Sequence, residues 1–182
     1  MMTGCAAAPD PTGSEPAAAQ SAAAPAPAAR PAPVAVAPPP SRVVVPAIDL
    51  DEPLIDLGIA EDGEMEVPAD YGDVGWFTGG GRPGARGPTV LAGHVDSTTG
   101  PAVFARLAEL TPGAEVTLVD TAGATAVYRV ERTGEYGKDR FPTGEVFGAI
   151  AADEIRLITC GGDFDSDAGS YERNVVVFGV RV

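Results

Sequence analysis

Short apolar runs, separated by turns rich in glycine and proline, recur through most of this chain. Runs of this length that are rich in branched residues are typical of β-strands, and several strands at near-regular spacing favour a closed or nearly closed barrel. We therefore expect a mostly β fold with one or two short helices. The expected strands lie at 42–50, 53–59, 89–95, 154–160 and 174–180, with a hairpin over 114–132.

Proline and glycine mark the expected breaks between these elements. Pro53 is expected to divide the first two strands, and the glycine-rich stretch 70–88 is expected to be a loop. Pro101 is expected to begin a short helix over 101–110, because apolar residues recur there at helical spacing. The last strand, 174–180, is too continuously apolar to lie at a sheet edge.

The stretch 1–40 differs from the rest of the chain in composition. It holds 15 Ala and 10 Pro, and its charged residues are Asp10, Glu15 and Arg30. A segment with so little apolar surface to bury stays disordered or adopts partly polyproline structure. We therefore expect a disordered Ala/Pro-rich spacer over 1–41 and a single folded domain over 42–182.

The domain expected at 42–182 is strongly acidic. It carries 24 acidic and 11 basic residues, a net charge of −13. The phosphate backbone of a nucleic acid is also negatively charged, so like charges oppose its binding to such a surface. A nucleic-acid partner is therefore not expected.

The two cysteines, Cys5 and Cys160, are too few for a disulfide scaffold or for a zinc site of the usual two-cysteine, two-histidine kind. Cys5 follows Thr-Gly, which resembles the end of a bacterial lipoprotein cleavage box, where the cysteine is lipidated. The apolar stretch that precedes such a box is absent from the sequence. Membrane attachment is therefore expected to depend on a lipidated Cys5 or on a missing N-terminal segment.

Two other stretches resemble binding motifs only in part. GGGRPG at 79–84 contains Pro83 and belongs to no strand–loop–helix unit, so it does not indicate nucleotide binding. The loop at 163–174 starts with alternating aspartates, as calcium loops do. However, Ala168 stands where a sharp turn requires glycine, and Asn174 stands where a bidentate glutamate belongs. A solvated acidic loop is the default interpretation, and a weak calcium site stays open.

Three side chains with complementary chemistry lie at strand ends. His94 follows one apolar run, Cys160 ends another, and Arg173 begins the last. If the first two strands run parallel and the last runs antiparallel to the second, all three reach one rim of the sheet. A thiol needs a proton-transfer partner to attack a carbonyl at neutral pH, histidine can supply it, and a cation can stabilise the resulting oxyanion.

These residues stand in motifs that resemble those of sortases, the cysteine transpeptidases of Gram-positive cell surfaces. LAGHVDS, RLITCGG and YERNVVV are similar to the family's histidine, thiol and arginine motifs, and the similarity runs over 42–182. The Cys-Gly-Gly followed by Phe-Asp, the stretch DVGWFTGGGRPGARGPTVLAGHVD and the segment VFARLAEL resemble class F and the related class E in particular.

The resemblance implies a closed eight-stranded sortase barrel and a role for each site residue. Cys160 would attack the Thr carbonyl of an LPXTG-like sorting signal, and cleavage between Thr and Gly would leave a thioacyl enzyme. His94 would act as general acid and base, and Arg173 would bind the oxyanion or the substrate backbone. Thr159 and Gly161, on either side of the thiol, would contact the substrate.

The resemblance also implies the partners and location of such an enzyme. A peptidoglycan precursor or another cell-surface amine would resolve the thioacyl enzyme, outside the cytoplasm of a Gram-positive-type bacterium. No metal or organic cofactor is called for. Asp96 is expected either to orient His94 or to cap a turn.

Three alternatives stay open at the level of sequence. An L,D-transpeptidase would also use cysteine, histidine and arginine, but its histidine is expected close to the thiol in sequence, whereas His94 lies far before Cys160. A hydrolytic cysteine peptidase would form the same thioacyl enzyme and pass it to water. In a non-catalytic surface module, Cys160 would pack as a small apolar residue and Arg173 would pair with a neighbouring acid.

Overall fold

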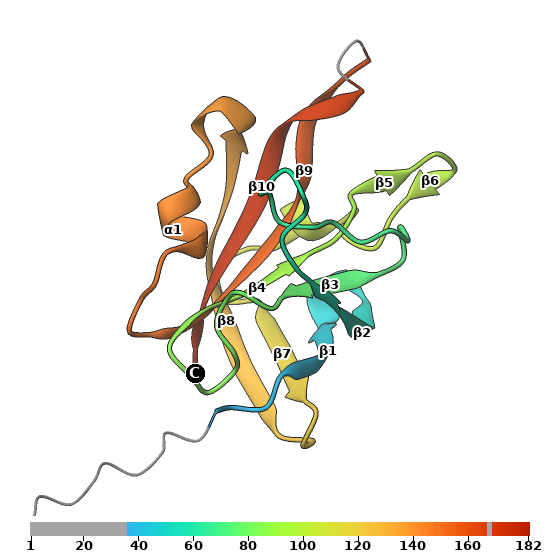
Figure 1. Ribbon diagram of the computed structural model, residues 1–182. Helices are drawn as coiled ribbons and strands as arrows, with labels where there is room; N and C mark the ends of the chain where they lie inside the picture. Colours follow the sequence, from blue (N-terminus) through green and yellow to red (C-terminus); the bar gives the residue numbers. More distant parts are fainter. Residues whose placement is uncertain (1–35, 167–168) are drawn as a thin grey trace, which may run out of the picture. The chain divides into compact units, whose positions relative to one another are not determined.

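Eight strands close into a barrel in the computed structural model, which describes residues 36–166 and 169–182 (Figure 1). The order around the barrel is β1-β2-β3-β4-β9-β10-β8-β7. This confirms the expected mostly β fold and the closed eight-stranded barrel. The strands are β1 Pro40–Val45, β2 Leu50–Leu57, β3 Val74–Phe77, β4 Gly87–Ala92, β7 Glu115–Asp120, β8 Thr125–Gly137, β9 Asp153–Asp165 and β10 Ser170–Arg181.

The remaining elements are short. β5 and β6 form a separate two-stranded sheet, and no helix within the described residues is long and apolar enough to cross a membrane. The domain begins with β1 at Pro40, slightly before the boundary expected at 42, while the spacer expected at 1–41 lies almost wholly outside the described residues. The short elements outside the barrel strands are β5 Asp96–Ser97, β6 Gly100–Pro101, α1 Thr143–Phe147, and the 3-10 turns η1 Pro46–Ile48, η2 Leu107–Glu109 and η3 Lys138–Arg140.

The prediction of a helix over 101–110 is wrong. That segment consists of β6, irregular turns and the 3-10 turn η2. Its apolar residues are still buried, since Phe104 and Leu107 are fully enclosed by the core. However, the N–H of Phe104 donates to His94 O at 2.8 Å, so this amide bonds to a neighbouring segment instead of a preceding turn of helix. Hydrogen bonds to a segment distant in the helix register have therefore prevailed over the helix that the spacing of apolar residues predicted.

Two other expectations about strand boundaries are also wrong. Pro53 lies inside β2, opposite Arg42, and the break between the first two strands falls at the 3-10 turn that begins with Pro46. Proline suits the first position of a helical turn, because its missing N–H is not needed there. The stretch expected to be a loop at 70–88 contains β3, whose Trp76 is almost fully buried in the barrel core.

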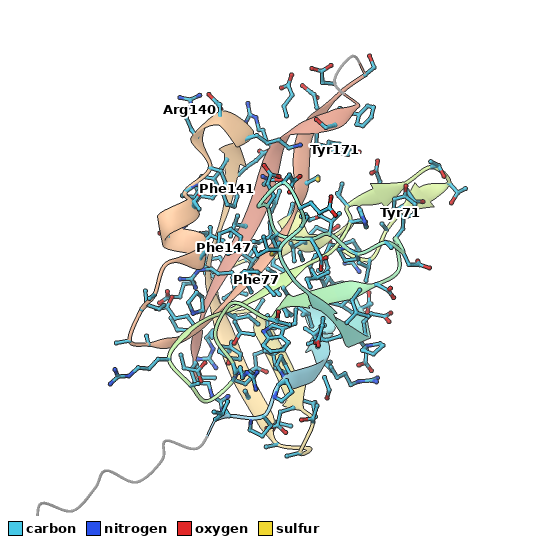
Figure 2. The ribbon with its side chains drawn as sticks, in the orientation of Figure 1. Tyr71, Phe77, Arg140, Phe141, Phe147 and Tyr171 are labelled. Atoms are coloured by element: carbon cyan, nitrogen blue, oxygen red, sulfur yellow. The ribbon has the colours of Figure 1, made fainter. Side chains whose placement is uncertain are left out.

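β9 is buried on both of its faces. Ile155 and Leu157 belong to the core cluster inside the barrel, and Ile158 belongs to a second cluster that includes Val146 of α1. Side chains alternate between the faces of a strand, so a strand covered on both sides is mostly apolar, and in this run Arg156 is the buried exception. At α1, the ring of Phe147 contacts the rings of both Phe77 and Phe141 (Figure 2).

The strand directions bring the end of β4 beside the middle parts of β9 and β10 at one rim of the barrel. The expectations that Cys160 ends its strand and that Arg173 begins the next are wrong, since β9 continues to Asp165 and β10 begins at Ser170. β4 pairs with β9 in parallel up to Ala92 and Ile158, and β9 pairs with β10 in antiparallel register, with Cys160 opposite Asn174 and Gly161 opposite Arg173. Both directions are those expected from the sequence. The β9–β10 hairpin continues past this rim and projects from the barrel (Figure 1).

Candidate active site

Cys160 lines a pocket of about 240 Å³ at this rim. Its side chain is partly buried and unpaired with any other cysteine of the described residues. Glu135 and Tyr171 are the titratable side chains that line the pocket with Cys160. The apolar part of the lining is Val95, Phe104, Ala105, Ala108 and Val175. The thiol thus lies between an apolar surface and a polar edge that a ligand could reach.

The surroundings of Cys160 favour the neutral thiol. Burial raises the pKa of Cys160, the charge of Lys138 lowers it, and the charge of Asp96 raises it further. A buried anion loses its hydration, and a nearby carboxylate adds like-charge repulsion, so the protonated form predominates at neutral pH. The site therefore needs a group that accepts the thiol proton before the sulfur can attack.

His94 is held by the segment that precedes β3. Its Nε2 lies 2.7 Å from Pro68 O, and the ring of Tyr71 is 4.9 Å from the imidazole, centroid to centroid, at 58°. A carbonyl oxygen only accepts hydrogen bonds, so Nε2 must carry a proton in this arrangement. Nδ1 is then the ring nitrogen that gains and loses a proton. Neither contact was predicted, because the sequence around Pro68 shows no sign of a site.

The aliphatic stem of Arg173 lies close to the backbone of Gly162, two residues after Cys160. Gly162 has a φ of +75°, and a Cβ added there would lie 2.9 Å from Arg173 Cγ. Glycine alone leaves room for this side chain and adopts this conformation without strain. The guanidinium is half-exposed and lies 3.8 Å from the carboxylate of Glu135. It also lines a second pocket of about 520 Å³, which borders the thiol pocket through Glu135.

Thr159 and Gly161 flank the thiol and have different surroundings. Thr159 is buried, and its hydroxyl donates to Gly93 O at 2.8 Å, which ties β9 to the residue before His94. Gly161 lines the thiol pocket, and a Cβ added there would lie 2.8 Å from Val175 Cγ2. Contact of either residue with substrate stays a prediction.

The three candidate catalytic side chains share one rim without bonding to each other. Within residues 36–166 and 169–182, no hydrogen bond or ion pair joins His94, Cys160 and Arg173. Asp96, which was expected to orient His94 or cap a turn, accepts a hydrogen bond from the hydroxyl of Tyr171.

The acidic loop at 163–174, for which a weak calcium site stayed open, is described only in part. Among the described residues, no group of three or more His, Cys, Asp or Glu side chains could hold a metal ion. Asp167 and Ala168 of that loop lie outside the described residues, so the weak calcium site stays a hypothesis.

The family follows from the match to a known domain. The family model of the sortase domain matches residues 43–182, which is most of the chain. The chain belongs to the sortase family. A search of curated protein sequences gave no match.

Solved sortase structures share this fold. Sortase C1 of Streptococcus agalactiae is 21% identical, with a TM-score of 0.61 over 78% of this chain and 66% of that one. Sortase C-1 of Actinomyces oris is 24% identical, with a TM-score of 0.59 over 78% and 71%. A lid mutant of sortase A from Corynebacterium diphtheriae is 20% identical, with a TM-score of 0.61 over 80% and 70%.

These likenesses concern the fold alone, because all three identities are low. The chain spans slightly less than two thirds of the S. agalactiae sortase C1 chain. Membership of class F or class E therefore stays a prediction that rests on the sequence motifs.

The raised pKa of Cys160 predicts how fast its thiol is alkylated at different pH values. Because only the thiolate reacts, the midpoint of iodoacetamide labelling should lie above that of the cysteine in a short peptide blocked at both ends, under the same conditions. Labelling of the full chain, followed by mass spectrometry of the peptide that contains Cys160, measures this. A midpoint below that of the free thiol would show that a cation stabilises the thiolate in the unliganded protein.

The close approach of Gly162 and Arg173 predicts a selective loss of activity in Gly162→Ala. The added methyl must displace the stem of Arg173, so cleavage of a sorting-signal peptide should fall about 10- to 100-fold, as expected when an oxyanion donor is misplaced. Gly123→Ala is the matched control, because Gly123 has a φ of +85° and a Cβ there would meet nothing within 4 Å.

Both glycine variants should lose similar stability, of about 1 kcal/mol, because both force alanine into a left-handed conformation. Thermal unfolding measures this common cost and separates it from the effect on catalysis. Equal activity of the two variants would show that the position of Arg173 does not depend on Gly162.

Proposed function

We propose that this sortase is a cysteine transpeptidase that cleaves an LPXTG-like sorting signal between Thr and Gly and transfers the new carboxyl end to a cell-surface amine. The observation that carries the proposal is the parallel pairing of β4 with β9 beside the antiparallel pairing of β9 with β10. It supports a joint role for His94, Cys160 and Arg173 at one rim, where Cys160 lines a partly apolar pocket.

Acylation begins when the Cys160 thiol gives its proton to His94 and the sulfur attacks the Thr carbonyl carbon. The carbonyl oxygen becomes an oxyanion, and the guanidinium of Arg173 binds it. When this intermediate collapses, the bond between Thr and Gly breaks. His94 gives its proton to the departing Gly amine, and the acyl group of Thr remains on sulfur as a thioester.

Transfer reverses the proton movements. The acceptor amine attacks the thioester carbon, His94 takes a proton from the amine nitrogen, and the new amide forms as the Cys160 sulfur leaves. The hydrogen bond from Nε2 to Pro68 O suits this cycle, because Nε2 stays protonated while Nδ1 accepts and returns the proton. Thr159 and Gly161 are proposed to contact the substrate beside the thiol.

The partners and location in this proposal follow those of the family. Sortases in general act on sorting-signal substrates and amine acceptors at Gram-positive cell surfaces, and a peptidoglycan precursor is the acceptor proposed here. The same proposal places the chain outside the cytoplasm, attached through a lipidated Cys5 or a preceding segment. Cys5 lies outside the described residues.

One observation favours the non-catalytic alternative. The guanidinium of Arg173 already faces the carboxylate of Glu135, and Cys160 is partly buried, as expected of a surface module without activity. However, this ion pair is long at 3.8 Å, and its two side chains are 53% and 43% exposed, so it contributes little to stability. A substrate oxyanion can therefore compete for the guanidinium at little cost.

Product analysis tests the proposal. The full chain is incubated with a panel of sorting-signal peptides, with and without an added amine such as triglycine, and the products are identified by mass. We expect peptide–amine conjugates from the wild-type chain and no turnover by Cys160→Ala. Cys5→Ser is the matched control and should retain full activity.

The other outcomes separate the alternatives. Free acid as the sole product at saturating amine would identify a hydrolytic cysteine peptidase. Full turnover by Cys160→Ala, or no covalent labelling of Cys160 by a thiol-reactive sorting-signal mimic, would count against any catalytic role for the thiol.

A further inference from the structure

Two side-chain hydrogen bonds hold the segment that carries His94, one on each side of it. On one side, Thr159 of β9 donates to Gly93 O. On the other side, the hydroxyl of Tyr171 on β10 donates to the carboxylate of Asp96. His94 thus lies between two anchors, and both anchors belong to the hairpin that carries Cys160 and Arg173.

The backbone alone does not hold this segment against β9. The ladder between β4 and β9 ends at Ala92 and Ile158, and a last backbone bond joins the N–H of Gly93 to Ile158 O at 3.2 Å. Beyond it, the N–H groups of Ala102 and Phe104 donate to Val95 O and His94 O, which ties the segment to the chain after β6. Side chains must therefore fix its distance from the hairpin.

Tyr171 is itself held in place to make this contact. It lies opposite Phe164 in the β9–β10 ladder, and the two rings meet edge to face with centroids 5.3 Å apart. Such aromatic pairs across strands restrict the rotation of both side chains. The label in Figure 2 locates Tyr171 on the part of the hairpin that projects beyond the rim.

The contact between Tyr171 and Asp96 lies within electrostatic range of the thiol. The hydrogen bond to Asp96 raises the pKa of Tyr171, and the charge of Asp96 also raises the pKa of Cys160. Tyr171 moreover lines the thiol pocket together with Cys160. Tyr171 therefore forms part of the wall of the thiol pocket and links it to Asp96.

We propose that Tyr171 and Asp96 are a positioning pair, which fixes the segment carrying His94 against the hairpin that carries Cys160 and Arg173. Neither residue takes part in a proton transfer of the reaction. The kinetic consequence rests on the proposed transpeptidase function, whereas the structural consequence, an ordered segment at 94–97, does not depend on it.

A double-mutant cycle on peptide cleavage by the full chain tests the pair. Tyr171→Phe and Asp96→Ala should each lower kcat roughly tenfold, the loss expected when one hydrogen bond no longer fixes the geometry, with little change in KM. The double variant should be no slower than either single one, because both remove the same contact. Asp96→Asn should lose less kcat than Asp96→Ala, since its amide oxygen still accepts the hydrogen bond and only the charge near Cys160 is removed.

Tyr128→Phe is the matched control. Tyr128 also donates to an aspartate, Asp153 at the start of β9, with 2.8 Å between the two oxygens, so the same type of hydrogen bond is lost far from the thiol along the strand. We expect Tyr128→Phe to lower stability while leaving the kcat of the folded protein unchanged. A merely structural role for Tyr171 would give the same pattern in Tyr171→Phe and would overturn the proposal.

Amide hydrogen exchange separates this proposal from the proposed function. The N–H groups of Ala102 and Phe104 report on the order of the segment, because they donate to Val95 O and His94 O. Both should exchange faster in Tyr171→Phe than in the wild-type chain or in Tyr128→Phe, even if no peptide is turned over. Unchanged exchange in Tyr171→Phe, or independent kcat losses that add in the double variant, would contradict the positioning pair.

Discussion

The parallel pairing of β4 with β9 is the constraint on which the rest of the site depends. β4 runs parallel to β9 up to Ala92 and Ile158, so His94, two residues further on, lies beside the part of β9 that carries Cys160, although the two residues lie far apart in the sequence. The antiparallel return of β10 then brings Arg173 opposite Gly161. Each strand is buried in the barrel, so a slip in register would cost core packing as well as the site.

At the rim, where the backbone pairing of β4 with β9 ends, other hydrogen bonds and close contacts hold the site residues. Thr159 connects β9 to Gly93, and Pro68 O fixes one nitrogen of His94. The backbone of Gly162 leaves room for the stem of Arg173. The imidazole and the guanidinium that the chemistry needs are thus positioned by neighbouring backbone, while burial raises the pKa of the Cys160 thiol.

Much of this arrangement could be predicted from the sequence. Apolar runs indicated β4, β9 and β10, and the position of His94 after one run and of Cys160 in another indicated a shared rim, although β9 continues to Asp165 instead of ending at Cys160. The sequence could not show the 3-10 turn in place of the helix at 101–110, because the amide of Phe104 bonds to a neighbouring segment. Nor could it show the contacts of Tyr171 and Pro68, since these depend on how loops far apart in the sequence meet.

A crystal structure of the chain with a thiol-reactive sorting-signal mimic attached to Cys160 tests the central claim most directly. We expect that Arg173 leaves Glu135 and donates to the oxygen of the bound acyl group, while Nδ1 of His94 faces the leaving-group side of the same carbon. A guanidinium that stays with Glu135, or an imidazole turned away from the adduct, would contradict the account.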